Sequence, residues 1–128
     1  MRERREYVRC NGLVLVNFKM PDESLEGKSS AFDICGTGLR ITVDKEIKLG
    51  TAAEVEIYLP GNSRPIVAKG ETVWLEKCEK KTKAQPDPKK EYFFVGLRFT
   101  KIDENSRTRI LNYVFRKTKQ YNDPNFNA

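Results

Sequence analysis

The sequence predicts a mainly β domain, in which several short antiparallel strands form a small barrel or sandwich and one helix follows them. Apolar and polar residues alternate in several segments, most strictly at residues 53–59, as in strands with one buried face. Turn residues, chiefly glycine and proline, separate these segments. Near the end the period changes, because an apolar stripe at helical spacing is formed by Ile110, Leu111, Val114 and Phe115.

The first half of the chain is expected to contain three strands. Residues 13–19 are rich in β-forming side chains, and residues 39–43 alternate between apolar and polar. Between them, residues 30–34 form a short strand that runs into a glycine-containing turn. Residues 20–30 contain proline, glycine and several charges, which favours a loop or hairpin connection.

The second half adds three more strands and the helix. These strands are expected at residues 53–59, 66–75 and 92–99. Residues 77–91 are charged and contain two prolines, so we expect a hairpin loop there. Gly96 marks a bend or a close backbone contact within the last strand. Asp103 is a suitable N-cap for a helix that continues to about Lys119.

The composition of the chain excludes several classes of function. A length of 128 residues suits one domain, and 24 Lys+Arg against 18 Asp+Glu give a net charge of +6, which favours anionic partners. The three cysteines lie far apart and there is no histidine, so we expect no metal site and no disulfide scaffold, as in a cytoplasmic protein. Neither a signal peptide nor a membrane-spanning segment is recognisable. Without histidine or a phosphate-binding glycine loop, we expect no enzymatic activity and no catalytic residues.

Two short motifs carry the functional signal. Arg5 and Arg9 are four positions apart, and arginine forks suit phosphate groups and the acceptor edge of guanine. The later motif runs from Asp33 to Gly38, where a carboxylate suits guanine donors and glycine allows close backbone approach. Each motif alone is also typical of an ordinary basic tail or an ordinary turn. Trp74 is expected in the core, with stacking on a ligand base as the second interpretation.

The order and spacing of these motifs resemble those of the PilZ domain family. An Arg-x-x-x-Arg motif and a strand precede Asp33-x-Cys35-x-x-Gly38, which is similar to the family's Asp/Asn-x-Ser-x-x-Gly. A later strand ends in Trp74, and residues 95–99 are similar to the strand that precedes the family's terminal helix. The resemblance covers about residues 4–117.

The resemblance implies a six-stranded antiparallel β-barrel with a C-terminal α-helix. Residues 1–11 would be a flexible arm that carries the arginine motif, residues 12–120 the barrel and helix, and residues 121–128 a frayed tail. Many PilZ domains are bacterial receptors for cyclic di-GMP, so we expect this ligand. We expect no cofactor. The other implied partner is an unidentified protein effector. No nucleic acid polymer and no membrane insertion are expected, and the domain would be a monomer or weak dimer.

The resemblance also implies which residues bind the ligand. Arg5 and Arg9 would hold its guanine and phosphate groups, with Arg4 assisting, and Asp33 would read a guanine donor edge. Gly38 would shape the turn that admits the base. Cys35 stands where the family has serine, and a thiol is the weaker hydrogen-bonding group. Losing one neutral hydrogen bond costs about 0.5–1.5 kcal/mol, roughly a few-fold to tenfold in affinity.

Two alternatives remain open at this point. A PilZ-like adaptor that has lost nucleotide binding and acts through protein contacts is the first, and Cys35 is its main support. The second is a basic barrel that binds nucleic acid, suggested by the net charge and by residues 77–90. Such barrels usually display several exposed aromatic residues, whereas the aromatic residues at 92–99 are expected to face the core.

Overall fold

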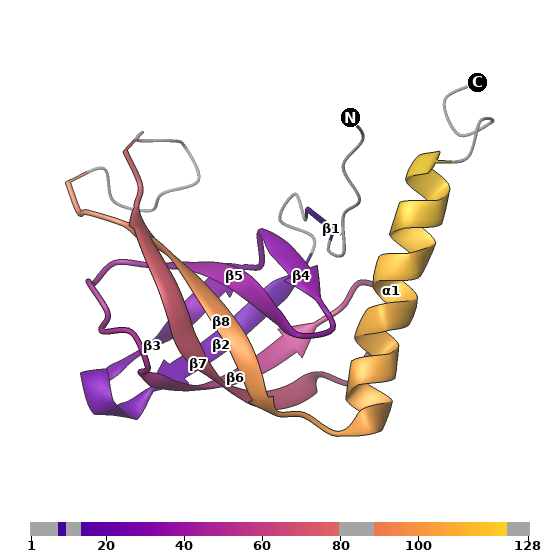
Figure 1. Ribbon diagram of the computed structural model, residues 1–128, viewed down its shortest axis with the longest axis horizontal. Helices are drawn as coiled ribbons and strands as arrows, with labels where there is room; N and C mark the ends of the chain where they lie inside the picture. The colour runs from indigo at the N-terminus through magenta and orange to yellow at the C-terminus, as the bar shows by residue number, and fades with distance from the viewer. Residues whose placement is uncertain (1–7, 10–13, 80–88, 123–128) are drawn as a thin grey trace.

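The chain folds into one curled antiparallel sheet with a helix alongside it (Figure 1). This computed structural model describes the backbone of residues 8–9, 14–79 and 89–122, and the side chains of residues 14–79 and 89–117. Within those ranges the sheet has eight strands in the order β1-β4-β5-β8-β7-β6-β2-β3. All neighbouring strands are antiparallel, so the mainly β fold with one C-terminal helix is confirmed.

The elements follow one another along the chain, and the connection between Lys77 and Phe93 is the longest of those after β2. Their bounds are β1 (Val8–Arg9), β2 (Leu15–Met20), η1 (Pro21–Glu23), β3 (Leu25–Ser30), β4 (Asp33–Cys35), β5 (Gly38–Val43), β6 (Ala52–Tyr58), β7 (Ile66–Lys77), β8 (Phe93–Lys101) and α1 (Glu104–Asn122). Six strands correspond to those expected from the sequence, and β1 and β3 are additional. The described strands therefore number eight, where six were expected.

Strand β3 lies where a loop or hairpin connection was expected. It pairs with β2 along its whole length, and the connection is η1 followed by Ser24 in the left-handed conformation, with φ of 51°. The hairpin interpretation is therefore right, but the segment is also a strand. Periodicity missed it because, of its inward residues Leu25, Gly27 and Ser29, only Leu25 is apolar, so the strand lacks an apolar face.

The strict alternation of β6 has the expected cause. Ala53, Val55 and Ile57 point into the curled sheet and are buried, while the residues between them are exposed. Inward residues of β2, β5, β7 and β8 complete one core. Tyr92 and Phe93 are buried and Phe99 packs against the core, as expected, whereas Phe94 is partly exposed and lies against Arg40, so the expectation is wrong for Phe94.

Helix α1 begins where the sequence indicated. The Asp103 carboxylate accepts a hydrogen bond from the backbone N–H of Ser106 at 2.7 Å, which confirms the N-cap. The expected apolar stripe is only partly buried: Ile110 is fully buried, but Leu111 and Phe115 are 48% and 64% exposed. The expected burial of those two side chains is wrong, because the buried face of α1 is centred on Ile110 and Tyr113.

Three expectations fall wholly or partly outside the described residues. The flexible arm expected at residues 1–11 lies outside them except for the backbone of Val8 and Arg9. Of the loop expected at 77–91, residues 80–88 lie outside, and of the tail expected at 121–128, residues 123–128 do. The backbone of α1 extends to Asn122, three residues beyond the expected end of the helix. In the described part of the chain, no helix combines the length and the hydropathy that a membrane span needs.

Candidate ligand-binding site

The turn between β4 and β5 consists of Gly36 and Thr37 and points toward α1 (Figure 1). Three contacts hold it. The guanidinium of Arg107 in α1 donates to the Gly36 carbonyl at 3.1 Å, and the Phe99 N–H of β8 donates to the Thr37 carbonyl at 2.8 Å. A β-carbon on Gly36 would lie 2.8 Å from the side chain of Leu111, so helix and turn are in direct contact. The turn is therefore fixed from both the helix and the sheet.

Gly38, the last residue of the second motif, has a packing reason to be glycine. It is paired with Arg98 of β8, and a β-carbon there would collide with the backbone carbonyl oxygen of Leu97. Backbone atoms of a central strand cannot move aside as a flexible side chain can. Close approach of two strands thus accounts for Gly38 without a ligand.

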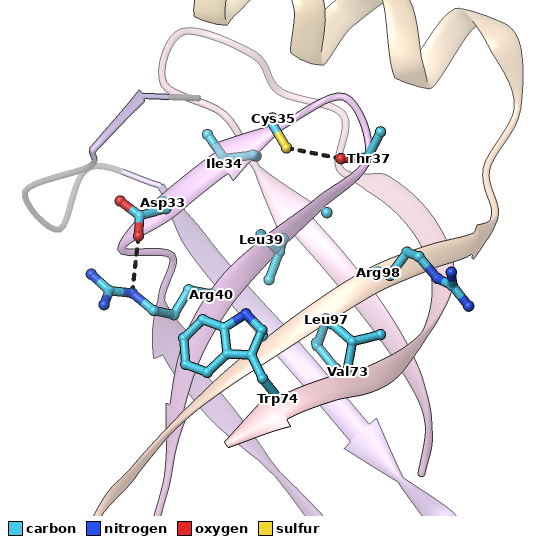
Figure 2. A pocket seen from close by; sticks show the side chains of 12 residues that line it. Asp33, Ile34, Cys35, Thr37, Leu39, Arg40, Val73, Trp74, Leu97 and Arg98 are labelled. Atoms are coloured by element: carbon cyan, nitrogen blue, oxygen red, sulfur yellow. Dashed lines mark hydrogen bonds and ion pairs between the residues drawn. The ribbon is translucent and has the colours of Figure 1, made fainter. Parts of the chain in front are cut away.

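Beside this hairpin is an open cavity of about 450 Å³ (Figure 2). Its lining comes from β4, β5, β7 and β8, and consists of Asp33, Ile34, Cys35, Thr37, Gly38, Leu39, Arg40, Val73, Trp74, Gly96, Leu97 and Arg98. Asp33 and Arg40 lie on one side, Cys35 and Thr37 lie at the hairpin end, and Arg98 points away (Figure 2). The second sequence motif therefore forms one wall of a cavity.

Trp74 lies in this cavity and not in the core. Its side chain is 41% exposed, so the expectation of a core tryptophan is wrong. The cause is an irregularity in the pairing of β7 with β8 between Thr72 and Trp74, which leaves Val73 and Trp74 exposed although they are consecutive. The indole rests on Gly96, where a β-carbon would overlap the ring, which confirms the close contact expected at that glycine. An exposed indole face in a cavity is suited to stacking on a flat ligand.

Two opposite charges meet across the β4–β5 hairpin. Asp33 is the direct cross-strand partner of Arg40, and Asp33 Oδ2 lies 3.1 Å from Arg40 Nε. The other carboxylate oxygen, Asp33 Oδ1, is buried and has no hydrogen-bond partner among the described residues. Arg40 is not part of the sequence prediction. The hairpin register could have found it, since a two-residue turn at positions 36 and 37 pairs position 33 with position 40.

Cys35 is partly exposed at the hairpin end of the cavity. Its Sγ atom lies 3.1 Å from Thr37 Oγ1, and either atom can donate. This contact occupies part of the thiol's weak hydrogen-bonding capacity. Among the described residues, no three Cys, His, Asp or Glu side chains gather as a metal site would require.

The arginine motif is described only in part. Arg4 and Arg5 lie outside the described residues, and only the backbone of Arg9 is described. That backbone belongs to β1, which pairs with β4 so that Arg9 is opposite Asp33 and Val8 is opposite Ile34. The two motifs, 24 positions apart at Arg9 and Asp33, are therefore neighbours in the sheet.

Comparison with known proteins identifies the family. The model of the PilZ domain matches residues 3–116, and the chain therefore belongs to the PilZ family. A search of curated protein sequences found no match.

Solved PilZ structures have the same fold. They include MotI/DgrA, the Bacillus subtilis inhibitor of motility (TM-score 0.66, 20% identity, 96% of this chain and 54% of that chain). The PilZ domain of YcgR from Escherichia coli with c-di-GMP is also similar (TM-score 0.64, 11% identity, 95% and 99%). A third is the K. pneumonia MrkH–c-di-GMP complex (TM-score 0.68, 10% identity, 94% and 54%). The chain thus spans about half the length of MotI/DgrA and MrkH and nearly all of the YcgR domain.

Proposed function

We propose that this PilZ domain is a non-enzymatic, cytoplasmic receptor for cyclic di-GMP that changes its surface on binding and so signals to a partner protein. The observation that carries the proposal is the pairing of β1 with β4, which sets the backbone of Arg9 opposite Asp33 beside an open cavity. Two similar structures, those of YcgR and MrkH, contain c-di-GMP, and this supports cyclic di-GMP as the ligand.

The cavity and the arginine motif together are proposed to supply a group for each part of such a ligand. Asp33 Oδ1 accepts no hydrogen bond from any described residue, which suits the N–H donors on the edge of guanine. Trp74 offers an exposed indole face to a purine ring. Arg5 and Arg9, with Arg4 beside them, are proposed to hold the phosphates and the guanine acceptor edge.

Signalling is proposed to start at the arginine motif and to use helix α1. Engagement of the arginines by a doubly charged ligand would fold the N-terminal arm, whose Val8 and Arg9 already pair with β4, over the sheet and change the surface offered to a protein effector. The hairpin that carries Asp33 also contacts α1 through the hydrogen bond from Arg107 to Gly36. A displacement of the hairpin on binding would therefore be transmitted to the helix. The domain is proposed to act as a monomer or weak dimer.

Calorimetric titration with cyclic di-GMP tests the proposal. The wild type is expected to bind, and Arg9→Ala and Asp33→Ala are expected to weaken binding about tenfold or more, because each removes a charge-assisted hydrogen bond. Arg116→Ala, which removes an exposed arginine of α1 away from the cavity, is the control and should bind like the wild type. Absence of heat for the wild type at high micromolar ligand contradicts the proposal.

The second candidate function is an adaptor without nucleotide binding, and the contact between Cys35 and Thr37 favours it. Where the family has a serine hydroxyl, the weaker thiol is engaged with a neighbouring side chain at 3.1 Å. Cys35→Ser separates the candidates: a large gain in affinity, from an undetectable wild-type level, means that the native site no longer serves nucleotide. A change in affinity of less than about tenfold equals the contribution of one neutral hydrogen bond, and it supports the function as a cyclic di-GMP receptor.

A further inference from the structure

We infer that Arg40 is a positioning residue, which holds the Asp33 carboxylate in one orientation and thereby sets the selectivity of the site for guanine. The inference rests on the proposed function, since it assigns a role within the same cavity. Arg40 lies outside both sequence motifs, yet its guanidinium contacts Asp33, with Nε 3.1 Å from Oδ2. Both side chains are largely shielded from water, being 26% and 22% exposed.

Two aromatic rings hold the guanidinium itself. The Arg40 Cζ atom lies 4.7 Å from the ring centre of Phe94 and 5.6 Å from that of Phe32. The rings are packed edge to face, with centroids 5.5 Å apart and planes at 81°. A planar guanidinium attracted to ring faces has few alternative rotamers, and an Arg that is already ordered loses less entropy when it pairs. The aromatic pair therefore orders Arg40, and Arg40 orders Asp33.

The consequence is an asymmetric carboxylate. Oδ2 forms an ion pair with Arg40, whose Nε makes no hydrogen bond in the described part of the chain, whereas Oδ1 is buried without a hydrogen-bond partner there. A buried acceptor without a partner is costly, so a ligand that supplies an N–H donor is favoured there. Guanine carries such donors on its imino and 2-amino nitrogens, and hypoxanthine keeps only the imino donor, so the selectivity inferred here is for the bond from the 2-amino group to Oδ1. A purine that lacks a donor at that point leaves the oxygen unsatisfied, and the site discriminates against it.

A purely structural ion pair makes a different prediction. If Arg40 only holds β4 against β5, its removal lowers stability, and all ligands of the site lose affinity by the same factor. If Arg40 positions Asp33, its removal lets the carboxylate rotate, and only ligands that use the guanine donors lose affinity. The ratio of two dissociation constants separates these cases, because a general weakening cancels in it.

The probes are cyclic di-GMP and cyclic di-IMP, whose hypoxanthine bases lack the 2-amino group. Calorimetric titration of the wild type is expected to give a preference for cyclic di-GMP of about tenfold to hundredfold, the value of one charge-assisted hydrogen bond. Arg40→Met should reduce this preference to within about threefold, the level expected for Asp33→Ala, since the same bond is lost. In the double variant Asp33→Ala/Arg40→Met the preference should not fall further, because the two residues act as one unit.

Two further variants keep the test decisive. Phe94→Leu leaves both charged partners in place and removes one ring beneath the guanidinium, so it should lower the preference partway while thermal unfolding shows that the domain is folded. Arg116→Met makes the same change of charge outside the cavity and should keep the wild-type preference. The inference is overturned if folded Arg40→Met or Phe94→Leu keeps the wild-type ratio, or if the wild type shows no preference. A wild type that does not bind cyclic di-GMP at all refutes the proposed function instead.

Discussion

The Gly38→Ala substitution tests whether the last residue of the second motif is needed for the fold or for the ligand. The added β-carbon would collide with the Leu97 carbonyl oxygen, and would lie 3.1 Å from the Leu97 carbonyl carbon and 3.2 Å from the Arg98 Cα atom. All three are backbone atoms of β8, the strand that pairs with β5 along six residues. Relief therefore requires the two strands to separate locally.

The expected loss of stability follows from this geometry. Overpacking a well-filled site typically costs about 1–3 kcal/mol, and separating the strands also weakens ladder hydrogen bonds worth about 1 kcal/mol each. Replacing glycine by alanine within a strand also raises the free energy of unfolding by roughly 0.5–1 kcal/mol, because alanine reduces the conformational freedom of the unfolded chain. We therefore expect Gly38→Ala to lower the free energy of unfolding by about 2–3 kcal/mol. For a chain of 128 residues, this corresponds to a fall in the melting temperature of roughly 9 °C.

Urea denaturation without ligand, followed by far-ultraviolet circular dichroism, measures this effect. Gly27→Ala is the matched control, because Gly27 also lies within a strand but its β-carbon would meet only the end of the Phe18 ring, at 3.2 Å. Its stability should differ from the wild type by less than about 1 kcal/mol. If Gly38→Ala unfolds like the wild type but loses cyclic di-GMP, the packing argument is refuted and Gly38 serves the ligand directly.

Three further predictions concern the ligand, the helix and the pH. Because Trp74 is the single tryptophan and is exposed in the cavity, cyclic di-GMP should change its fluorescence in a saturable titration, and an unchanged spectrum despite calorimetric binding would exclude stacking. Asp103→Ala should lower the free energy of unfolding by about 1 kcal/mol, and Asp103→Asn by clearly less, in urea titrations. Burial raises the pKa of the Cys78 thiol above its ordinary value of 9.0. Its contribution to stability is therefore complete below about pH 9 and is lost as the pH rises through the folded-state pKa, so Cys78→Ala should flatten that part of the pH profile.

Much of the candidate site could be read from the sequence because its chemistry lies in short segments. The stretch from Asp33 to Gly38 combines a carboxylate with turn residues, and it does form a hairpin beside a cavity. Arg40 was missed although it is only two positions beyond that stretch. Its importance depends on which residue stands opposite Asp33, and on Phe94 from a strand more than 50 positions away.

The strands with alternating residues, the capped helix and the two motifs were determined by the sequence alone. Each depends on neighbours within about four positions, where alternation, turn residues and a capping carboxylate act locally. The tertiary structure alone decided that Trp74 faces the cavity, that Leu111 and Phe115 remain exposed, and that β1 pairs with β4. These features depend on strand register and on contacts between distant segments, and a single shifted pairing such as that after Thr72 reverses the face to which a side chain points.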